Sequence, residues 1–203
     1  MHKIIALALG ILAVAGVTGA VAAPAQQGAM ALAKGVCSAC HGPEGRSVSP
    51  VFPRLAGQQS AYIMLQLDAF RGHQRADPNA QAYMWGMASQ LGDETIKELA
   101  DYYAAQKPVA GLAGDPALVT AGEKIYADGI PAQGVPACAS CHGANAEGAA
   151  AFPRLGGQHV DYLITQLQGF QSGVRSNAPI MLAVVRTLTA EQTKAVAAYA
   201  ASR

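Results

Sequence analysis

The sequence lacks an excess of charge of either sign, because 14 lysines and arginines face 13 aspartates and glutamates. It has neither a basic stripe nor an acidic tail, which argues against nucleic acid as a partner. Strand patterns are weak everywhere, and no apolar run after the N-terminal end is long enough to span a bilayer. These absences favour a helical protein whose function depends on a few special residues.

Cysteine is also scarce, and all four cysteines fall into two C-x-x-C-H motifs. The motifs consist of Cys37, Cys40 and His41, and of Cys138, Cys141 and His142. This is the attachment signature of c-type haem. Two thiols at this spacing can each form a thioether to one vinyl group of a haem, and the adjacent histidine can reach the iron. We therefore predict two covalently attached haem c groups, with no thiol left for a disulfide or a nucleophile.

Two other interpretations of paired cysteines are weaker. A thioredoxin-like redox motif needs a βαβ setting, and neither motif has strand patterns around it. A zinc site needs four ligands in one cluster, and the motifs lie about a hundred positions apart.

The N-terminal end reads as a secretory signal peptide over residues 1–23. Met1-His2-Lys3 precedes an apolar stretch, and Ala20-Val21-Ala22 fits a small-residue cleavage site. An uncleaved membrane anchor is the alternative. Export to the periplasm agrees with the motifs, since bacteria attach haem to C-x-x-C-H outside the cytoplasmic membrane.

The chain is a tandem repeat, because Phe52-Pro53-Arg54-Leu55 and the following x-Gly-Gln recur a hundred positions later. We predict an all-α fold of two tandem domains, each a few short helices wrapped around one covalent haem. The predicted domains are 24–107 and 117–203, joined by a Pro- and Gly-rich linker at 108–116. Apolar spacing predicts helices over 29–36, 59–72, 93–106, 119–127, 159–173 and 190–202. Domains this small predict a poorly folded haem-free chain.

The repeat also selects the second iron ligand of each haem. Met84 lies seven residues before Leu91, and Met181 lies seven residues before Leu188. Methionine with histidine is a common axial pair in electron-transfer cytochromes, so we predict Met84 and Met181 as ligands. Met87 falls opposite Val184 and is interpreted as a packing residue.

Two histidines and several polar groups have weaker assignments. His73 and His159 have no partner in the repeat, so we do not expect either to bind iron. The Pro53 and Pro153 carbonyls are hypothesised to accept the second ring N–H of the proximal histidines. Four arginines are interpreted either as contacts to haem propionates or as solvated side chains: Arg54, Arg75, Arg154 and Arg175.

Taken together, the C-x-x-C-H motifs, the F-P-R-L-x-G-Q segments, Met84, the linker and Met181 resemble the dihaem cytochrome c4 family over nearly the whole mature chain. The resemblance implies two class I cytochrome c domains related by a pseudo-twofold axis, with haem edges facing and propionates near the interface. It implies a periplasmic carrier, soluble or loosely membrane-associated, that passes electrons toward a terminal oxidase. Its donor would be a quinol-oxidising complex or a dehydrogenase. One departure is a longer stretch, Ala127–Ala137, before the second motif.

The expected mechanism is Fe(II)/Fe(III) cycling of two irons whose axial positions are both filled, which predicts an electron carrier and not an enzyme. Two alternatives stay open. One is the dihaem cytochrome subunit of a flavocytochrome c-type dehydrogenase. The other is a dihaem peroxidase or thiosulfate-oxidising enzyme, which needs an iron that can open or a distinctive Cys or His ligand.

Overall fold

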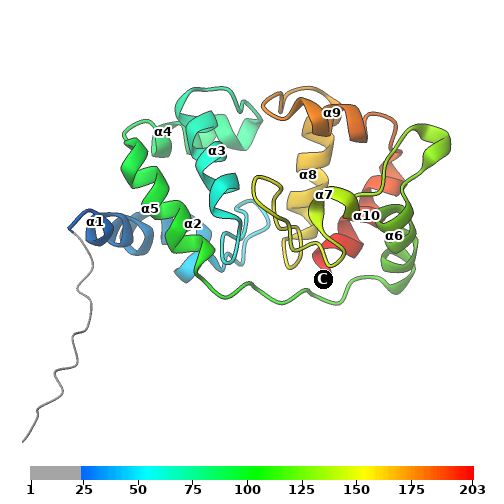
Figure 1. Ribbon diagram of the computed structural model, residues 1–203, viewed down its shortest axis with the longest axis horizontal. Helices are drawn as coiled ribbons and strands as arrows, with labels where there is room; N and C mark the ends of the chain where they lie inside the picture. Colours follow the sequence, from blue (N-terminus) through cyan, green and yellow to red (C-terminus); the bar gives the residue numbers. More distant parts are fainter. Residues whose placement is uncertain (1–23) are drawn as a thin grey trace, which may run out of the picture.

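This computed structural model describes residues 24–203, which form two helical halves that lie side by side (Figure 1). The predicted signal peptide lies outside the described residues. In the N-terminal half the helices are α1 (Pro24–Leu32), α2 (Ser38–His41), α3 (Ser60–Arg71), α4 (Trp85–Ala88) and α5 (Asp93–Ala104). In the C-terminal half they are α6 (Pro116–Asp128), α7 (Ala139–His142), α8 (Val160–Gln171), α9 (Pro179–Val185) and α10 (Ala190–Ala201).

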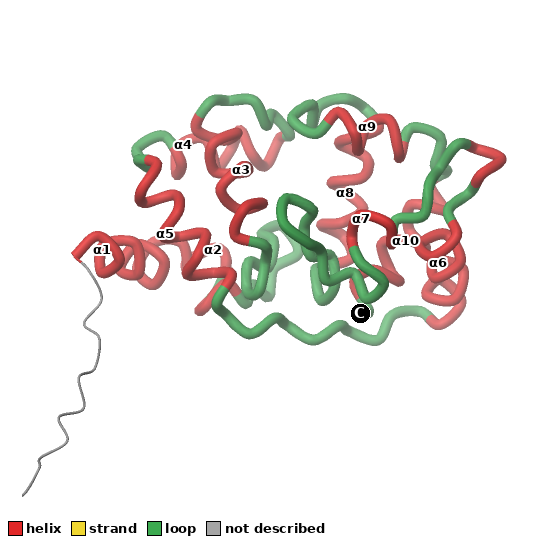
Figure 2. The backbone as a smooth tube through the Cα atoms, in the orientation of Figure 1, coloured by secondary structure: helices red, strands yellow, loops and turns green. Residues whose placement is uncertain are grey.

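Loops and helices account for nearly all of the described chain (Figure 2). Within residues 24–203 the β-structure is limited to two isolated bridges, Ile130 with Val135 and Ala149 with Phe152. The prediction of an all-α protein is therefore confirmed. The segment between α5 and α6 runs along one side of the molecule and connects the two halves (Figure 1). No helix in the described part of the chain has the length and apolar character to cross a membrane.

Helix ends follow local sequence signals. Asp115 caps α6, because its side chain accepts hydrogen bonds from the Ala117 and Leu118 N–H groups. Thr189 and Gln192 form a capping box at the start of α10, with both reciprocal hydrogen bonds present. These caps satisfy backbone N–H groups that no helical carbonyl can reach.

The two methionine segments are helical, although none of the predicted helices includes Met84 or Met181. Ala80–Met84 forms a π-helical turn that continues into α4, and Met181 lies within α9. Pro179 occupies the first turn of α9, where its fixed φ favours a helix and its missing N–H costs nothing. Both ligand candidates are thus held on short rigid elements.

Each half buries its own apolar core between its first and last helices and around its middle helix. The N-terminal core includes Ile63, Leu67, Phe70, Ile96, Leu99 and Tyr103. The C-terminal core includes Tyr126, Leu163, Val196, Tyr199 and Ala200, with a neighbouring cluster of Val135, Phe170, Val185 and Leu188. Because each core is separate, each half can hold one prosthetic group against its own helices.

Candidate functional site

The two C-x-x-C-H motifs fold alike. The first cysteine of each pair precedes a four-residue helix, α2 or α7, that carries the second cysteine and the histidine. All four thiols are free, with Cys37 and Cys138 partly buried and Cys40 and Cys141 exposed. Burial raises the pKa of Cys37, and it raises the pKa of Cys138 to about 11. Cys37 and Cys138 are therefore protonated at neutral pH, unlike the low-pKa thiolates of thioredoxin-like pairs.

Both motif histidines are buried and oriented by a proline carbonyl. His41 donates its Nδ1–H to the Pro53 oxygen at 2.9 Å, and His142 donates to the Pro153 oxygen at 3.0 Å. The hypothesised carbonyl partners are therefore present in both halves. Burial lowers the pKa of both rings, outweighing the hydrogen bond that raises it, so the rings are neutral at pH 7. A neutral ring with Nδ1 engaged leaves Nε2 for a metal.

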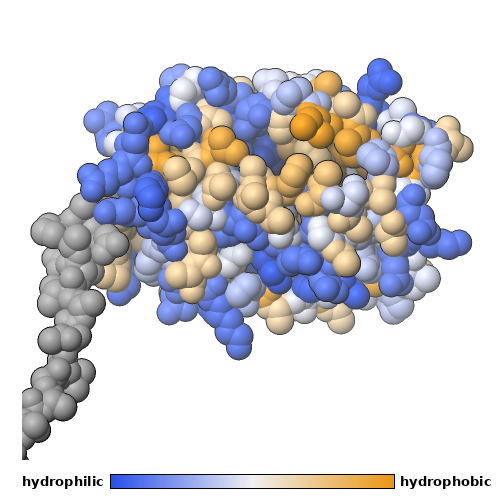
Figure 3. Space-filling model, in the orientation of Figure 1, coloured by the Kyte–Doolittle hydropathy of each residue, from blue (hydrophilic) through white to orange (hydrophobic). Residues whose placement is uncertain are grey.

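A large apolar cavity joins the predicted ligands. Its volume is about 680 Å³, and residues of both halves line it. In the N-terminal half the lining includes His41, Met84 and both cysteines, and in the C-terminal half it includes the four equivalent residues. An apolar space that brings two thiols, one free imidazole nitrogen and one thioether together fits a covalently bound haem. Figure 3 shows hydrophobic surface over α9, on which Ile180 is 66% exposed.

Other residues weighed as ligands are placed differently. His73 stacks on Trp85 with ring centroids 4.0 Å apart, and neither His73 nor His159 is among the residues that line the cavity. Met87 borders the cavity but is 57% exposed. The geometry thus favours Met84 over Met87 as the residue that faces the interior.

The centre of the interface between the halves is a buried polar cluster. Arg75 reaches across to the Gln166 Oε1 at 2.8 Å and to the Tyr162 hydroxyl at 3.1 Å. The equivalent crossing runs from Arg175 to the Tyr62 hydroxyl at 2.9 Å and to the Gln66 Oε1 at 3.0 Å. Arg75 is 4% exposed and Arg175 is 3% exposed, so these two arginines are buried and are not solvated. Both line the cavity, where a cation can hold a propionate.

The cluster carries different charges on its two sides. Asp77 forms a buried ion pair with Arg75 at 2.9 Å. The residue two places after Arg175 is Asn177, whose side-chain nitrogen donates to Gln66. A buried arginine without a carboxylate partner retains an unneutralised positive charge, which favours an anion beside it.

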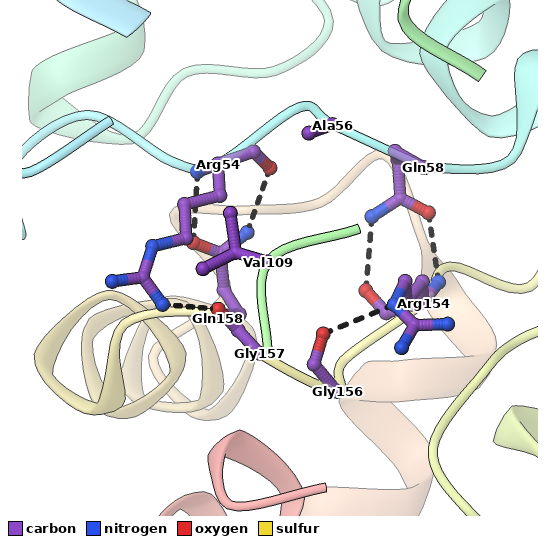
Figure 4. A pocket seen from close by; sticks show the side chains of 8 residues that line it. All are labelled: Arg54, Ala56, Gln58, Val109, Arg154, Gly156, Gly157 and Gln158. Atoms are coloured by element: carbon purple, nitrogen blue, oxygen red, sulfur yellow. Dashed lines mark hydrogen bonds between the residues drawn. The ribbon is translucent and has the colours of Figure 1, made fainter. Parts of the chain in front are cut away.

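A second contact between the halves involves the two F-P-R-L-x-G-Q segments (Figure 4). The side-chain amide of Gln158 accepts from the Arg54 N–H and donates to the Arg54 carbonyl, and Gln58 bonds the backbone of Arg154 in the same way. Arg54 also donates its side chain to the Gly157 carbonyl of the other half. Of the predicted arginine roles, that of Arg54 is therefore at least partly structural.

Sequence reasoning missed the crossing of these bonds between halves. The signal was present, since Tyr62, Gln66 and Arg75 recur as Tyr162, Gln166 and Arg175. Repeated polar residues on a helix face point to an interface when the two copies meet through a twofold relation. The repeat alone, however, does not say whether each arginine bonds its own half or the opposite one.

Comparison with known proteins identifies the family. The cytochrome c family model matches residues 25–105 and again residues 119–202. The chain is 41% identical to cytochrome c4 of Azotobacter vinelandii, over 81% of this chain and 82% of that protein. It is 37% identical to a protein of Thiomonas intermedia named thiosulfate dehydrogenase electron acceptor, over 90% of this chain and 85% of that one.

A solved structure gives the same result. The crystal structure of reduced recombinant cytochrome c4 from Pseudomonas stutzeri superposes with a TM-score of 0.77 at 38% identity, covering 88% of this chain and 97% of that one. Two cytochrome c domains, each with a C-x-x-C pair, fit two covalent haem c groups, and the chain is an electron carrier rather than an enzyme. The predicted fold class, cofactors and resemblance are thereby confirmed, and the chain belongs to the cytochrome c4 family of dihaem electron carriers.

Proposed function

We propose that this cytochrome relays electrons through two haem irons, each ligated by one histidine and one methionine. His41 and Met84 hold the first iron, and His142 and Met181 hold the second. Thioethers form at Cys37 and Cys40 in one half and at Cys138 and Cys141 in the other. The observation that carries this proposal is repeated in both halves: a buried histidine with its Nδ1 engaged shares an apolar cavity with one repeat-matched methionine.

The protein side chains define what the sites can do. The carbonyls of Pro53 and Pro153 fix the orientation of the two proximal histidine rings, and burial keeps these rings neutral. The bound haem supplies the Fe(II)/Fe(III) couple, and methionine as an axial ligand raises its potential. The buried guanidinium groups of Arg75 and Arg175 offset the negative charge of propionates at the interface. With one histidine and one methionine to hold each iron, the sites would exchange electrons without binding a substrate.

The location and domain limits follow from the sequence. Residues 1–23 act as a signal peptide that sends the mature chain to the periplasm, with loose association to the membrane. The N-terminal domain spans 24–107 and the C-terminal domain spans 117–203, with 108–116 as the linker. N-terminal sequencing of the protein from the periplasmic fraction tests the cleavage, and intact mass tests the two haem adducts.

The partners are redox proteins on both sides. We place the chain between a donor, either a quinol-oxidising complex or a dehydrogenase, and a terminal oxidase. The relative named as an electron acceptor of thiosulfate dehydrogenase favours a dehydrogenase as one donor. Adding thiosulfate or a quinol to cell extracts that contain the oxidised holoprotein separates these donors by which one reduces it.

The ligands are tested by replacing each methionine in the holoprotein. Met84→Leu and Met181→Leu should each remove half of the near-infrared band that marks methionine ligation of ferric haem, and should lower one of the two midpoint potentials. Met87→Leu is the matched control and should leave the band intact. Loss of the band in Met87→Leu, with Met84→Leu unchanged, would contradict the assignment.

A further inference from the structure

A single peptide group lies between each proximal histidine and the opposite domain. The Pro53 carbonyl accepts the His41 Nδ1–H at 2.9 Å, and the N–H of the same peptide, on Arg54, donates to the Gln158 Oε1 at 2.9 Å. His41 and Gln158 are therefore joined through two hydrogen bonds and one amide. Figure 4 shows how Gln158 faces Arg54 across the interface.

The same arrangement recurs with the domains exchanged. The Pro153 carbonyl accepts the His142 Nδ1–H at 3.0 Å, and the Arg154 N–H donates to the Gln58 Oε1 at 2.7 Å. Each domain thus contributes one glutamine to the peptide that holds the histidine of the other domain (Figure 4). Because both copies have this geometry, it belongs to the repeated architecture and not to one loop.

The two glutamines are fixed in place. Gln158 also donates its Nε2–H to the Arg54 carbonyl at 3.0 Å, and Gln58 donates to the Arg154 carbonyl at 2.9 Å. Each Oε1 accepts a further backbone N–H from the residue after the glutamine, at 3.1 Å and 2.9 Å respectively. Both side chains are buried, at 8% and 7% exposure. A buried amide with both ends engaged has one orientation, so its effect on the bonded peptide is constant.

Such a chain of hydrogen bonds is polarising. When the amide N–H donates, its carbonyl becomes a better acceptor, because linked hydrogen bonds strengthen one another. A stronger bond at Nδ1 makes the imidazole a more basic ligand. A more basic axial ligand stabilises Fe(III) relative to Fe(II) and so lowers the reduction potential.

We propose that Gln58 and Gln158 are positioning residues that set the reduction potential of the haem in the opposite domain. Gln158 acts on the N-terminal haem through His41, and Gln58 acts on the C-terminal haem through His142. This inference rests on the proposed function, in which these histidines bind the irons. Through these bonds the interface becomes part of the electronic environment of each iron, so each domain influences the reduction potential of the haem in the other.

The test is a redox titration of the holoprotein followed by NMR, with the haem methyl signals of each domain assigned separately. Gln158→Met removes the amide while keeping the length of the side chain. It should change the Fe(II)/Fe(III) ratio of the N-terminal haem about threefold in favour of Fe(II) at a fixed applied potential, which is about 28 mV. The C-terminal haem should shift by less than half as much. Gln58→Met should give the reverse pattern.

Two controls separate this effect from damage to the interface. Gln59 donates to the Glu147 carbonyl of the other half at 3.0 Å without touching either histidine-linked peptide. Gln59→Met therefore removes a bond between the domains and should leave both potentials within the error of wild type. In addition, the Nδ1 proton of His41 should exchange faster with solvent in Gln158→Met and not in Gln58→Met.

The crossed pattern decides the outcome. A shift confined to the haem of the mutated domain, equal shifts of both haems, or no shift would each overturn the proposal. Failure of the proposed ligation would appear differently, as the absence of the methionine band in the unmodified holoprotein.

Discussion

The two domains bind equivalent groups but fill the space behind them with tyrosines from opposite helices. In the N-terminal domain Tyr103 comes from the last helix, α5, and shares a core cluster with Ala33. In the C-terminal domain Tyr126, from the first helix, α6, is more deeply buried than Tyr199 of α10, and it clusters with Ala200. By the repeat, Ala200 is the counterpart of Tyr103, because Tyr102 matches Tyr199. A repeated site therefore constrains the volume of the core more than the position that fills it.

The first and last helices also approach each other differently. A Cβ on Gly122 of α6 would collide with the Ala195 carbonyl and Tyr199 of α10, so glycine is what permits this close crossing. In α1, Gly28 has no atom within 4 Å of where a Cβ would lie. The C-terminal domain thus has a tighter helix pair of its own, whereas its counterpart depends more on other contacts.

A third difference is the longer segment before the second C-x-x-C-H motif. Ile130 and Val135 form a small bridge in it, with backbone hydrogen bonds of 2.8 and 3.2 Å. Thr187 donates its hydroxyl to the Gln133 carbonyl at 2.9 Å, which ties the segment to the end of α9. The N-terminal domain has only the π-helical turn Ala33–Cys37 in this place. The insertion therefore reshapes the surface and adds buried contacts, while the equivalent cysteine and histidine still line the cavity.

The largest expected effect comes from removing one haem at a time. We expect the loss of one haem adduct and the unfolding of much of one domain from each of two double substitutions, Cys37→Ala with Cys40→Ala and Cys138→Ala with Cys141→Ala. The reason is that a domain this small depends on its covalent haem to complete the apolar core. The C-terminal domain should retain more helix, since α6 and α10 pack directly on each other. Intact mass and far-UV circular dichroism measure both effects. A fully helical, cooperatively unfolding protein after either pair of changes would contradict the dependence on haem.

Substitution of the helix glycines should have the next largest effect. Gly122→Ala should lower the free energy of unfolding of the C-terminal domain by about 2–3 kcal/mol, because the added methyl group overpacks a helix crossing. Gly28→Ala, the matched change in α1, should raise stability by about 0.5–1 kcal/mol through helix propensity. Denaturant unfolding measures both. Equal effects of the two changes would remove the contrast between the helix pairs.

Removing the hydroxyl groups of Tyr126 and Tyr103 should have smaller and unequal effects on the stability of the two domains. Tyr126 donates its hydroxyl to the Gly143 carbonyl at 2.8 Å, so Tyr126→Phe should cost about 1–2 kcal/mol. Within the described chain the buried Tyr103 hydroxyl interacts with the Cys37 sulfur but bonds no oxygen or nitrogen, so Tyr103→Phe should be neutral or slightly stabilising. The measurement is thermal unfolding of the holoprotein. A larger loss from Tyr103→Phe would show that its hydroxyl bonds the attached cofactor.

The smallest effect concerns acid stability. Hydrogen bonds from Lys97 and Ser60 lower the pKa of Asp101, and the repeat places Ala198 at the matching position. A carboxylate with a lowered pKa stabilises the fold above its unfolded value of 3.8, and that contribution is lost as the pH falls through its folded pKa. The N-terminal domain should therefore lose slightly more stability in acid than the C-terminal domain does, and Asp101→Asn should remove this difference.

Fluorescence of Trp85, the single tryptophan of the chain, reports on the N-terminal domain in this titration. Lys194→Gln serves as a control, because it changes the matching lysine in a domain where Ala198 takes the place of Asp101. If Asp101→Asn does not change the pH midpoint of acid unfolding, this surface carboxylate contributes nothing measurable to acid stability.

Much of the fold and site could be predicted from the sequence because the informative signals are local. The spacing of Cys37, Cys40 and His41 indicates haem attachment directly, because it lets two thiols and one imidazole reach the same haem. The capping box at Thr189 and the apolar spacing of α3 and α8 depend only on neighbouring residues. The helices around Met84 and Met181 were not predicted, because such short helices gain their stability from tertiary packing more than from propensity.

By itself, the sequence determined which groups are attached, how often, and in which repeated order, because thioether formation and axial ligation require particular side chains at short separations. The tertiary structure alone decided that Arg75, Arg175, Gln58 and Gln158 each bond the opposite domain, and that Tyr103 and Tyr126 fill matching space from different helices. These choices join residues up to 113 positions apart, as between Arg175 and Tyr62. Their energies depend on how two folded surfaces meet, and no local pattern along the chain encodes that meeting.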